Sequence, residues 1–142
     1  MICCISRNKF INRSDIFIRY CFDVIFNFNR NVQKFKIRNK LIEINFPFID
    51  LNLVLGKREG YNVKPDPANN TELMEKMQVK PEEVLYVGDS LVDIKTAQNS
   101  SLKAVSVSWG FVDKDRLVQA KPDYIIDKPD ELIDIIEKIN KE

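Results

Sequence analysis

Histidine is missing from this 142-residue sequence, and cysteine and glycine are scarce, with three and four residues. Without histidine, the Ser-His and Cys-His nucleophilic systems and histidine-ligated zinc sites are excluded. Cys3, Cys4 and Cys21 lack metal-site spacing, and their odd number argues against a secreted disulfide framework, so we expect free thiols. Any hydrolytic chemistry is therefore expected to use carboxylates, lysine and a metal ion.

Long apolar runs and a large charge excess are also absent. No apolar stretch approaches the length of a membrane span, the start lacks a clean signal-peptide pattern, and the net charge is +1. This charge gives no overall reason to expect a nucleic acid or a membrane as partner. We therefore expect a cytoplasmic protein, with enough residues for one domain that has a real core.

Residues 1–46 contain no glycine or proline, and their charge differs from that of the rest of the chain. They carry nine Lys or Arg against three Asp or Glu, which is most simply explained as a solvated basic face. Residues 16–28 favour a strand, whereas residues 32–45 fit either a strand or a basic amphipathic helix. We therefore expect an atypical N-terminal segment over residues 1–46 and an α/β core over residues 47–142.

After Pro47, short apolar runs alternate with helical patterns. Strands are predicted at residues 49–55, 84–87, 104–107 and 124–126, and helices from the cap at Asp66 to Met77, at residues 93–99 and 113–120, and from Pro129 onward. This alternation predicts an open, doubly wound parallel sheet, which is a Rossmann-like α/β fold. Ligands of such sheets bind beyond the carboxyl ends of the strands, where the loops 56–64, 88–90 and 108–110 fall.

Two acids stand at the start of the helix that follows the sequence VLYVGDSLVD, residues 84–93. Asp89 and Asp93 are four residues apart, so they share one helix face, and Ser90 is a suitable helix cap. Mg²⁺ takes one or two protein carboxylates and completes its shell with water and phosphate oxygens. The pair therefore predicts a magnesium site, although a purely structural helix cap would leave the same pattern.

Lys64 precedes Pro65, which favours an extended loop conformation for the lysine. A lysine beside a magnesium-binding carboxylate pair can neutralise the oxygens of a phosphoryl group. Since a single loop lysine is usually only solvated, the prediction depends on a combination of motifs. These are KPDP at residues 64–67, GDSLVD at residues 88–93 and the apolar run that ends at Gly110.

In this order and spacing, the motifs resemble those of the haloacid dehalogenase-like (HAD) phosphatases, particularly the phosphoglycolate phosphatase group, over residues 49–136. Lys64 matches the lysine that steadies the nucleophile and the phosphate in that family, and Asp89 and Asp93 match its magnesium carboxylates. The resemblance further implies a HAD-like fold, Mg²⁺ as cofactor, Ser90 in phosphate binding and a small phosphorylated metabolite as substrate. VSWGF at residues 107–111 and KPDYIID at residues 121–127 also match.

Other features of that family are missing. The family's first motif, DxDGT, supplies the aspartate nucleophile and an acid–base aspartate, and no such motif occurs in this sequence. The nearest string leaves Asp23 as the candidate nucleophile and has Ile25 in place of the second aspartate. Arg38 stands in place of the second motif's hydroxyl residue, and Ser101 in place of a usual glycine. We therefore expect an incomplete HAD-like core without a cap domain.

These departures leave two functional interpretations open. The first is a phosphatase-type hydrolase that acts on phosphate monoesters through an aspartyl-phosphate, with weak or no turnover because the DxDGT nucleophile is absent. The alternative is a non-catalytic module that binds phosphate or a partner. A receiver-type signalling domain fits less well, because its lysine follows the acids, whereas Lys64 precedes Asp89. A truncated, fused or frame-shifted coding sequence would explain both the lost motifs and the change near residue 46.

Overall fold

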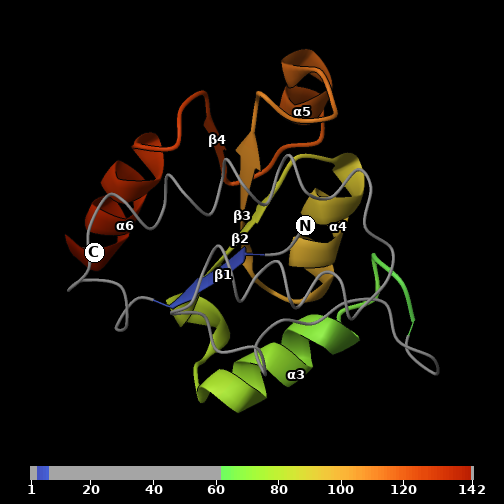
Figure 1. The fold of residues 1–142 in the computed structure, drawn as a ribbon, viewed down its shortest axis with the longest axis vertical. Helices are drawn as coiled ribbons and strands as arrows, with labels where there is room; N and C mark the ends of the chain where they lie inside the picture. The colour runs from blue at the N-terminus through green and yellow to red at the C-terminus, as the bar shows by residue number, and fades with distance from the viewer. Residues whose placement is uncertain (1–2, 7–61, 142) are drawn as a thin grey trace, which may run out of the picture.

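The computed structural model describes residues 3–6 and 62–141, which form one sheet with helices packed around it (Figure 1). The strands lie in the order β1-β2-β3-β4. Their bounds are Cys3–Ser6 for β1, Val84–Gly88 for β2, Lys103–Val107 for β3 and Tyr124–Ile126 for β4. Since β2, β3 and β4 are parallel, the predicted α/β sheet is confirmed for this part of the chain.

The predicted strands at residues 84–87, 104–107 and 124–126 are present, the first two each longer by one residue. Helices cover both faces of the sheet, so β2 and β3 are buried along most of their length, including the polar Ser106 of β3. Their register pairs Val87 with Val105 and Gly88 with Ser106, so the two strands end side by side. The predicted elements at residues 16–28, 32–45 and 49–55 lie outside the described residues.

The sequence analysis did not predict β1, which pairs with β2 in the antiparallel direction. Cys3 faces Val87 and Ser6 faces Val84, so the amino end of β1 lies beside the carboxyl end of β2. A four-residue strand without flanking glycine or proline gives almost no sequence signal. The described sheet is therefore mixed at this edge, not wholly parallel as expected.

The four predicted helices are all present within about two residues of their expected ends. Their bounds are Ala68–Met77 for α3, Leu91–Asn99 for α4, Lys114–Gln119 for α5 and Glu131–Lys141 for α6, and the short 3₁₀ helix η2, Pro81–Glu83, leads into β2. At the N-termini of α3 and α4, a side-chain oxygen accepts a hydrogen bond from a backbone N–H. Asp66 accepts a hydrogen bond from the Ala68 N–H at 2.9 Å, and Ser90 accepts one from the Asp93 N–H at 3.3 Å.

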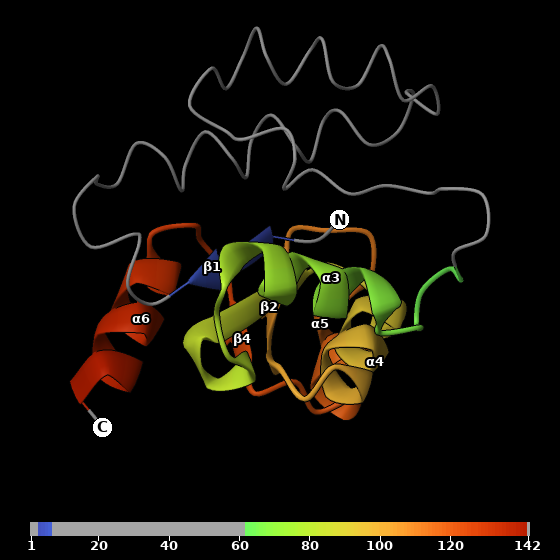
Figure 2. The same cartoon turned by 90° about the horizontal axis from the view of Figure 1, so that it is seen from below.

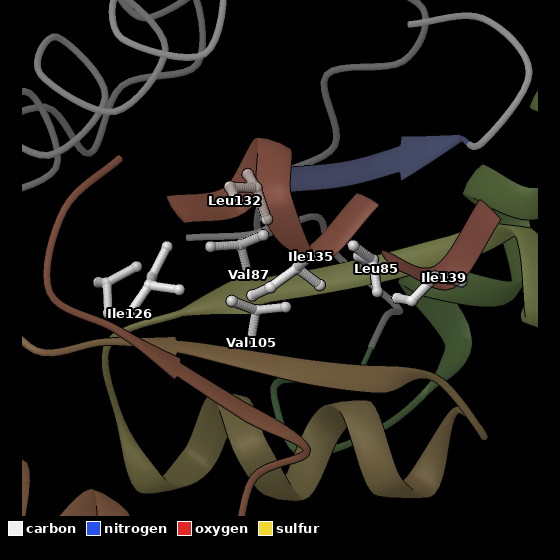
Figure 3. Close-up of a cluster of buried hydrophobic side chains, with 8 residues drawn as sticks. Leu85, Val87, Val105, Ile126, Leu132, Ile135 and Ile139 are labelled. Carbon is white, nitrogen blue, oxygen red and sulfur yellow. The ribbon is translucent and has the colours of Figure 1, made fainter. Parts of the chain in front are cut away.

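The helices form layers on the two faces of the sheet (Figures 1 and 2). On one face α6 packs against the strands, and the buried side chains of this cluster are Leu85, Val87, Val105, Val107, Ile126, Leu132, Ile135 and Ile139 (Figure 3). The opposite face holds Val84, Tyr86, Ala97, Leu102 and Ala104, with Met74 of α3 packed against them. In the described part of the chain, no helix combines the length and the apolar character needed to span a membrane.

Candidate functional site

Lys64 and Asp93 form an ion pair at the carboxyl end of β2. The Lys64 Nζ atom lies 2.6 Å from Asp93 Oδ1, although the two residues are 29 positions apart in the sequence. The Asp93 side chain is only 4% exposed, whereas that of Lys64 is 27% exposed. The ammonium group therefore stands at the border between the protein interior and solvent, where a bound anion can reach it.

Both carboxylate oxygens of Asp93 accept further hydrogen bonds. Oδ1 accepts one from the Tyr86 hydroxyl at 3.2 Å, in addition to the bond from Lys64. Oδ2 accepts one from the Ser90 hydroxyl at 2.6 Å and one from the Asp89 N–H at 3.3 Å. Asp93 is therefore held in a fixed orientation by donors from the KPDP loop, from β2 and from the turn between β2 and α4.

Asp89 is bound more loosely than Asp93. Its Oδ2 atom accepts a hydrogen bond from the Phe111 N–H at 3.0 Å, which ties it to the loop after β3. Among the described residues, no hydrogen bond reaches its Oδ1 atom, and the side chain is half-buried. A half-buried carboxylate with one open oxygen suits a hard cation such as Mg²⁺. By this test Asp89 fits a direct metal ligand better than Asp93 does.

Two glycines make room for the two acids. A Cβ atom on Gly88 would lie less than 3.0 Å from the side chain of Asp93, and one on Gly110 would lie equally close to Cβ of Asp89. Either contact is shorter than real Cβ atoms tolerate, so a larger residue would displace the acid. Gly88, the last residue of β2, and Gly110, in the loop after β3, therefore leave the space that the two acids occupy.

The charge state of Asp93 follows from these contacts. Burial would raise the pKa of its carboxyl group, but the positive charge nearby, including that of Lys64, and the hydrogen bonds from Lys64 and Ser90 hold the pKa below its usual value. Asp93 is therefore ionised at neutral pH. An ionised, buried acid keeps Lys64 in place by charge as well as by hydrogen bonding.

Contacts outside the ion pair fix the loops that carry these residues. The Asn99 side chain donates to the Pro65 carbonyl at 2.8 Å, so the far end of α4 binds the loop of Lys64. Asp127, just after β4, accepts hydrogen bonds from Ser108 at 2.6 Å and from Lys114 at 2.7 Å. The second set joins both ends of the loop that presents the Phe111 N–H to Asp89.

The structure brings together Lys64, Ser90, Asp89 and Asp93, the site residues predicted in the described part of the chain. Asp23 and Arg38 lie outside the described residues. β1 contributes no carboxylate, and no group of three or more metal-ligating side chains is found within residues 3–6 and 62–141.

Sequence reasoning missed two groups of the site, Tyr86 and the Phe111 N–H. A tyrosine within an apolar strand is a usable signal, because its buried hydroxyl usually finds a partner.

The family model of haloacid dehalogenase-like hydrolases matches residues 29–107, which is more than half of the chain. The chain therefore belongs to the haloacid dehalogenase-like hydrolase family, as its motifs indicated. The matched range includes Lys64, Ser90, Asp89 and Asp93.

Two similar proteins are pyrophosphatases named PpaX. That of Bacillus mycoides (strain KBAB4) is 42% identical over 79 residues, which are 56% of this chain and 37% of the relative. That of Bacillus cereus (strain B4264) is 39% identical over 80 residues, with the same shares of 56% and 37%. The chain thus spans little more than a third of the length of these relatives.

Solved structures agree with the fold. A protein from Lactobacillus delbrueckii subsp. bulgaricus, provisionally named a phosphoglycolate phosphatase, has a TM-score of 0.62 and 30% identity, over 69% of this chain and 41% of that one. A protein from Bacteroides vulgatus, provisionally named a β-phosphoglucomutase, has a TM-score of 0.64 at 17% identity, over 73% of this chain and 44% of that one. The second likeness concerns the fold alone.

Proposed function

We propose that this chain carries the magnesium- and phosphate-binding part of a phosphatase-type hydrolase site. The observation behind the proposal is the Lys64–Asp93 ion pair, 2.6 Å long, at the strand end that also carries Asp89. A fixed ammonium group beside an open carboxylate matches the two charges of a metal-bound phosphoryl group. A purely structural helix cap accounts for Ser90 but not for a lysine drawn in from a distant loop.

In this proposal each side chain has a separate role. Asp89 would hold Mg²⁺, because its Oδ1 atom accepts no hydrogen bond from the described residues, while the Phe111 N–H binds its Oδ2 atom. Asp93 adds the second negative charge and holds Lys64, whose ammonium group pairs with the phosphoryl oxygens. Ser90 positions Asp93 by donating its one hydroxyl hydrogen to Oδ2, so a hydrogen bond from Ser90 to phosphate would have to replace this one. When bound, Mg²⁺ supplies charge neutralisation on the phosphoryl oxygens.

The substrate class follows from the same charges. Mg²⁺ and the Lys64 ammonium group together would select a compact group with several anionic oxygens. A small phosphate monoester and pyrophosphate both have such a group. The names of two similar proteins point to pyrophosphate, and that of one similar structure points to phosphoglycolate. We therefore propose a small phosphorylated metabolite as the ligand, with pyrophosphate as the first compound to test.

Turnover requires a nucleophile besides these groups. Without a DxDGT motif, Asp23 is the remaining proposal for the attacking carboxylate, and it lacks the second aspartate that would act as acid and base. Losing the covalent route removes most of the rate, not a small part of it. We therefore expect the chain to bind a phosphoryl group in a Mg²⁺-dependent manner and to hydrolyse it slowly.

The test combines binding and turnover on the full chain. Calorimetry would measure pyrophosphate binding with and without Mg²⁺, and phosphate release would be followed with pyrophosphate, phosphoglycolate and a generic aryl phosphate. Asp89→Asn is expected to weaken Mg²⁺-dependent binding by at least about tenfold, the lower end of the effect of groups that only support a metal ligand. Asp115→Asn, the same change at an exposed acid on α5, is the matched control and should bind normally.

The non-catalytic module is the second candidate, and the absence of DxDGT favours it. Mg²⁺-dependent hydrolysis that disappears in Asp89→Asn would establish the hydrolase. Tight binding without release of phosphate would establish the module. If pyrophosphate and Mg²⁺ bind neither together nor separately, both proposals fail and the ion pair is structural.

A further inference from the structure

Tyr86 contacts both members of the Lys64–Asp93 ion pair. Its hydroxyl donates a hydrogen bond to Asp93 Oδ1 at 3.2 Å, and this oxygen is the one that also binds Lys64 Nζ. The same ammonium group lies over the tyrosine ring, 5.7 Å from the ring centroid, within the range of a cation–π interaction. One side chain therefore supports the acid through its hydroxyl and the lysine through its ring.

The backbone and ring of Tyr86 are much more constrained than Lys64. Tyr86 is the middle residue of β2, with register partners Cys4 on one side and Ala104 on the other. It is only 1% exposed and packs in the core between the sheet and α4. Lys64, in contrast, reaches its position from a loop on a flexible four-carbon stem.

We propose that Tyr86 is a positioning residue, which holds the Lys64 ammonium group and the Asp93 carboxylate where a phosphoryl group binds. The proposal rests on the proposed function and deepens it by adding a residue that touches neither metal nor substrate. The physical reason is the shared Oδ1 atom. With the hydroxyl in place, Oδ1 is bound from the rigid strand β2 as well as by Lys64, so the carboxylate does not rotate to follow a moving lysine. The Tyr86 ring, which packs against the ammonium group, then restricts the movement of the Lys64 side chain.

Two variants separate the two contacts. Tyr86→Phe keeps the ring and the packing and removes the hydroxyl, whereas Tyr86→Leu removes the ring as well. Tyr124→Phe is the matched control, because Tyr124 lies on β4, packs against the α6 cluster and belongs to the other face of the sheet. Thermal unfolding would show that each variant is folded before it is compared.

The first readout does not depend on activity. In protein with ¹⁵N-labelled lysine at fixed pH, a hydrogen-bonded ammonium group exchanges its protons slowly, and the Lys64 signal is assigned by its loss in Lys64→Met. We expect proton exchange at Lys64 to be about tenfold faster in Tyr86→Phe, the factor that corresponds to the loss of one hydrogen bond, and faster still in Tyr86→Leu. Tyr124→Phe should leave this rate unchanged.

The second readout is pyrophosphate affinity in the presence of Mg²⁺, or kcat if the chain turns over. Small displacements of a positioned group cost up to about a hundredfold, so we expect about a tenfold loss in Tyr86→Phe with the melting temperature nearly unchanged. An unchanged exchange rate in both Tyr86 variants would overturn the proposal, as would faster exchange with unchanged affinity. If the unmodified chain binds no pyrophosphate, the proposed function fails, and the exchange rates alone decide whether Tyr86 holds Lys64.

Discussion

Gly110 provides the space that the side chain of Asp89 occupies, so this glycine and this acid form a steric pair. Adding a methyl group at Gly110 would place it within 3.0 Å of Asp89 Cβ. Overpacking of this kind costs about 1–3 kcal/mol. We expect Gly110→Ala to lower the free energy of unfolding by that amount, measured in urea, and to weaken Mg²⁺ binding because Asp89 is displaced.

A double-mutant cycle checks the cause, because the predicted clash is with the Cβ atom of Asp89. Asp89→Gly removes that atom, so Gly110→Ala should cost much less stability in the Asp89→Gly background than in the unmodified chain. Residues in contact show coupling energies of about 0.5–3 kcal/mol. Strictly additive costs would mean that Gly110 matters for its backbone and not for the space beside the acid.

At the scale of elements, the loop between β3 and α5 is joined to the end of β4 by Asp127. Hydrogen bonds from Lys114 and Ser108 hold the pKa of Asp127 below its usual value. For a depressed pKa, the stabilising contact is present above the unfolded-state pKa and is lost as the pH falls through the folded-state pKa. We therefore expect the NMR signals of Ser108 and Phe111 to change below about pH 4, as Asp127 is protonated.

Replacing the acid identifies the group responsible for this change. In Asp127→Asn the transition of Ser108 should disappear, whereas Asp115→Asn on α5 should leave it in place. The exposed Lys114–Asp127 bridge adds little to global stability, so the melting temperature is expected to stay nearly constant. A Ser108 transition that persists in Asp127→Asn would assign the titration to another acid.

The elements that sequence predicted well are those whose signals are local. β4 at Tyr124–Ile126 and α4 after Ser90 follow from an apolar run and a helix cap, and both lie where expected. β1 was missed because four residues without turn signals carry no pattern. The contact of Tyr86 with Lys64 was missed for a different reason, since it joins the interior of a strand to a loop 22 residues earlier. Only tertiary packing creates such a contact.

On the scale of the whole molecule, the two faces of the sheet have different tasks. Lys64, Ser90 and Asp93 belong to the loop and helix on the α4 side, whereas the α6 side contributes apolar packing (Figure 3). Helix α6 buries Leu132 completely, at 0% exposure, against the parallel strands. Stability and ligand binding should therefore be separable by mutation.

Leu132→Ala leaves a cavity between α6 and the sheet, and such truncations cost about 2–5 kcal/mol. We expect this variant to unfold at clearly lower urea concentration while its folded fraction binds Mg²⁺ and pyrophosphate with unchanged affinity. Asp89→Asn should show the opposite result, with affinity lost and the unfolding midpoint retained, because its side chain is half-buried at the rim. If Leu132→Ala weakened binding as strongly as stability, the site would depend on the packing of both faces, and the division of tasks inferred from the contacts would be wrong.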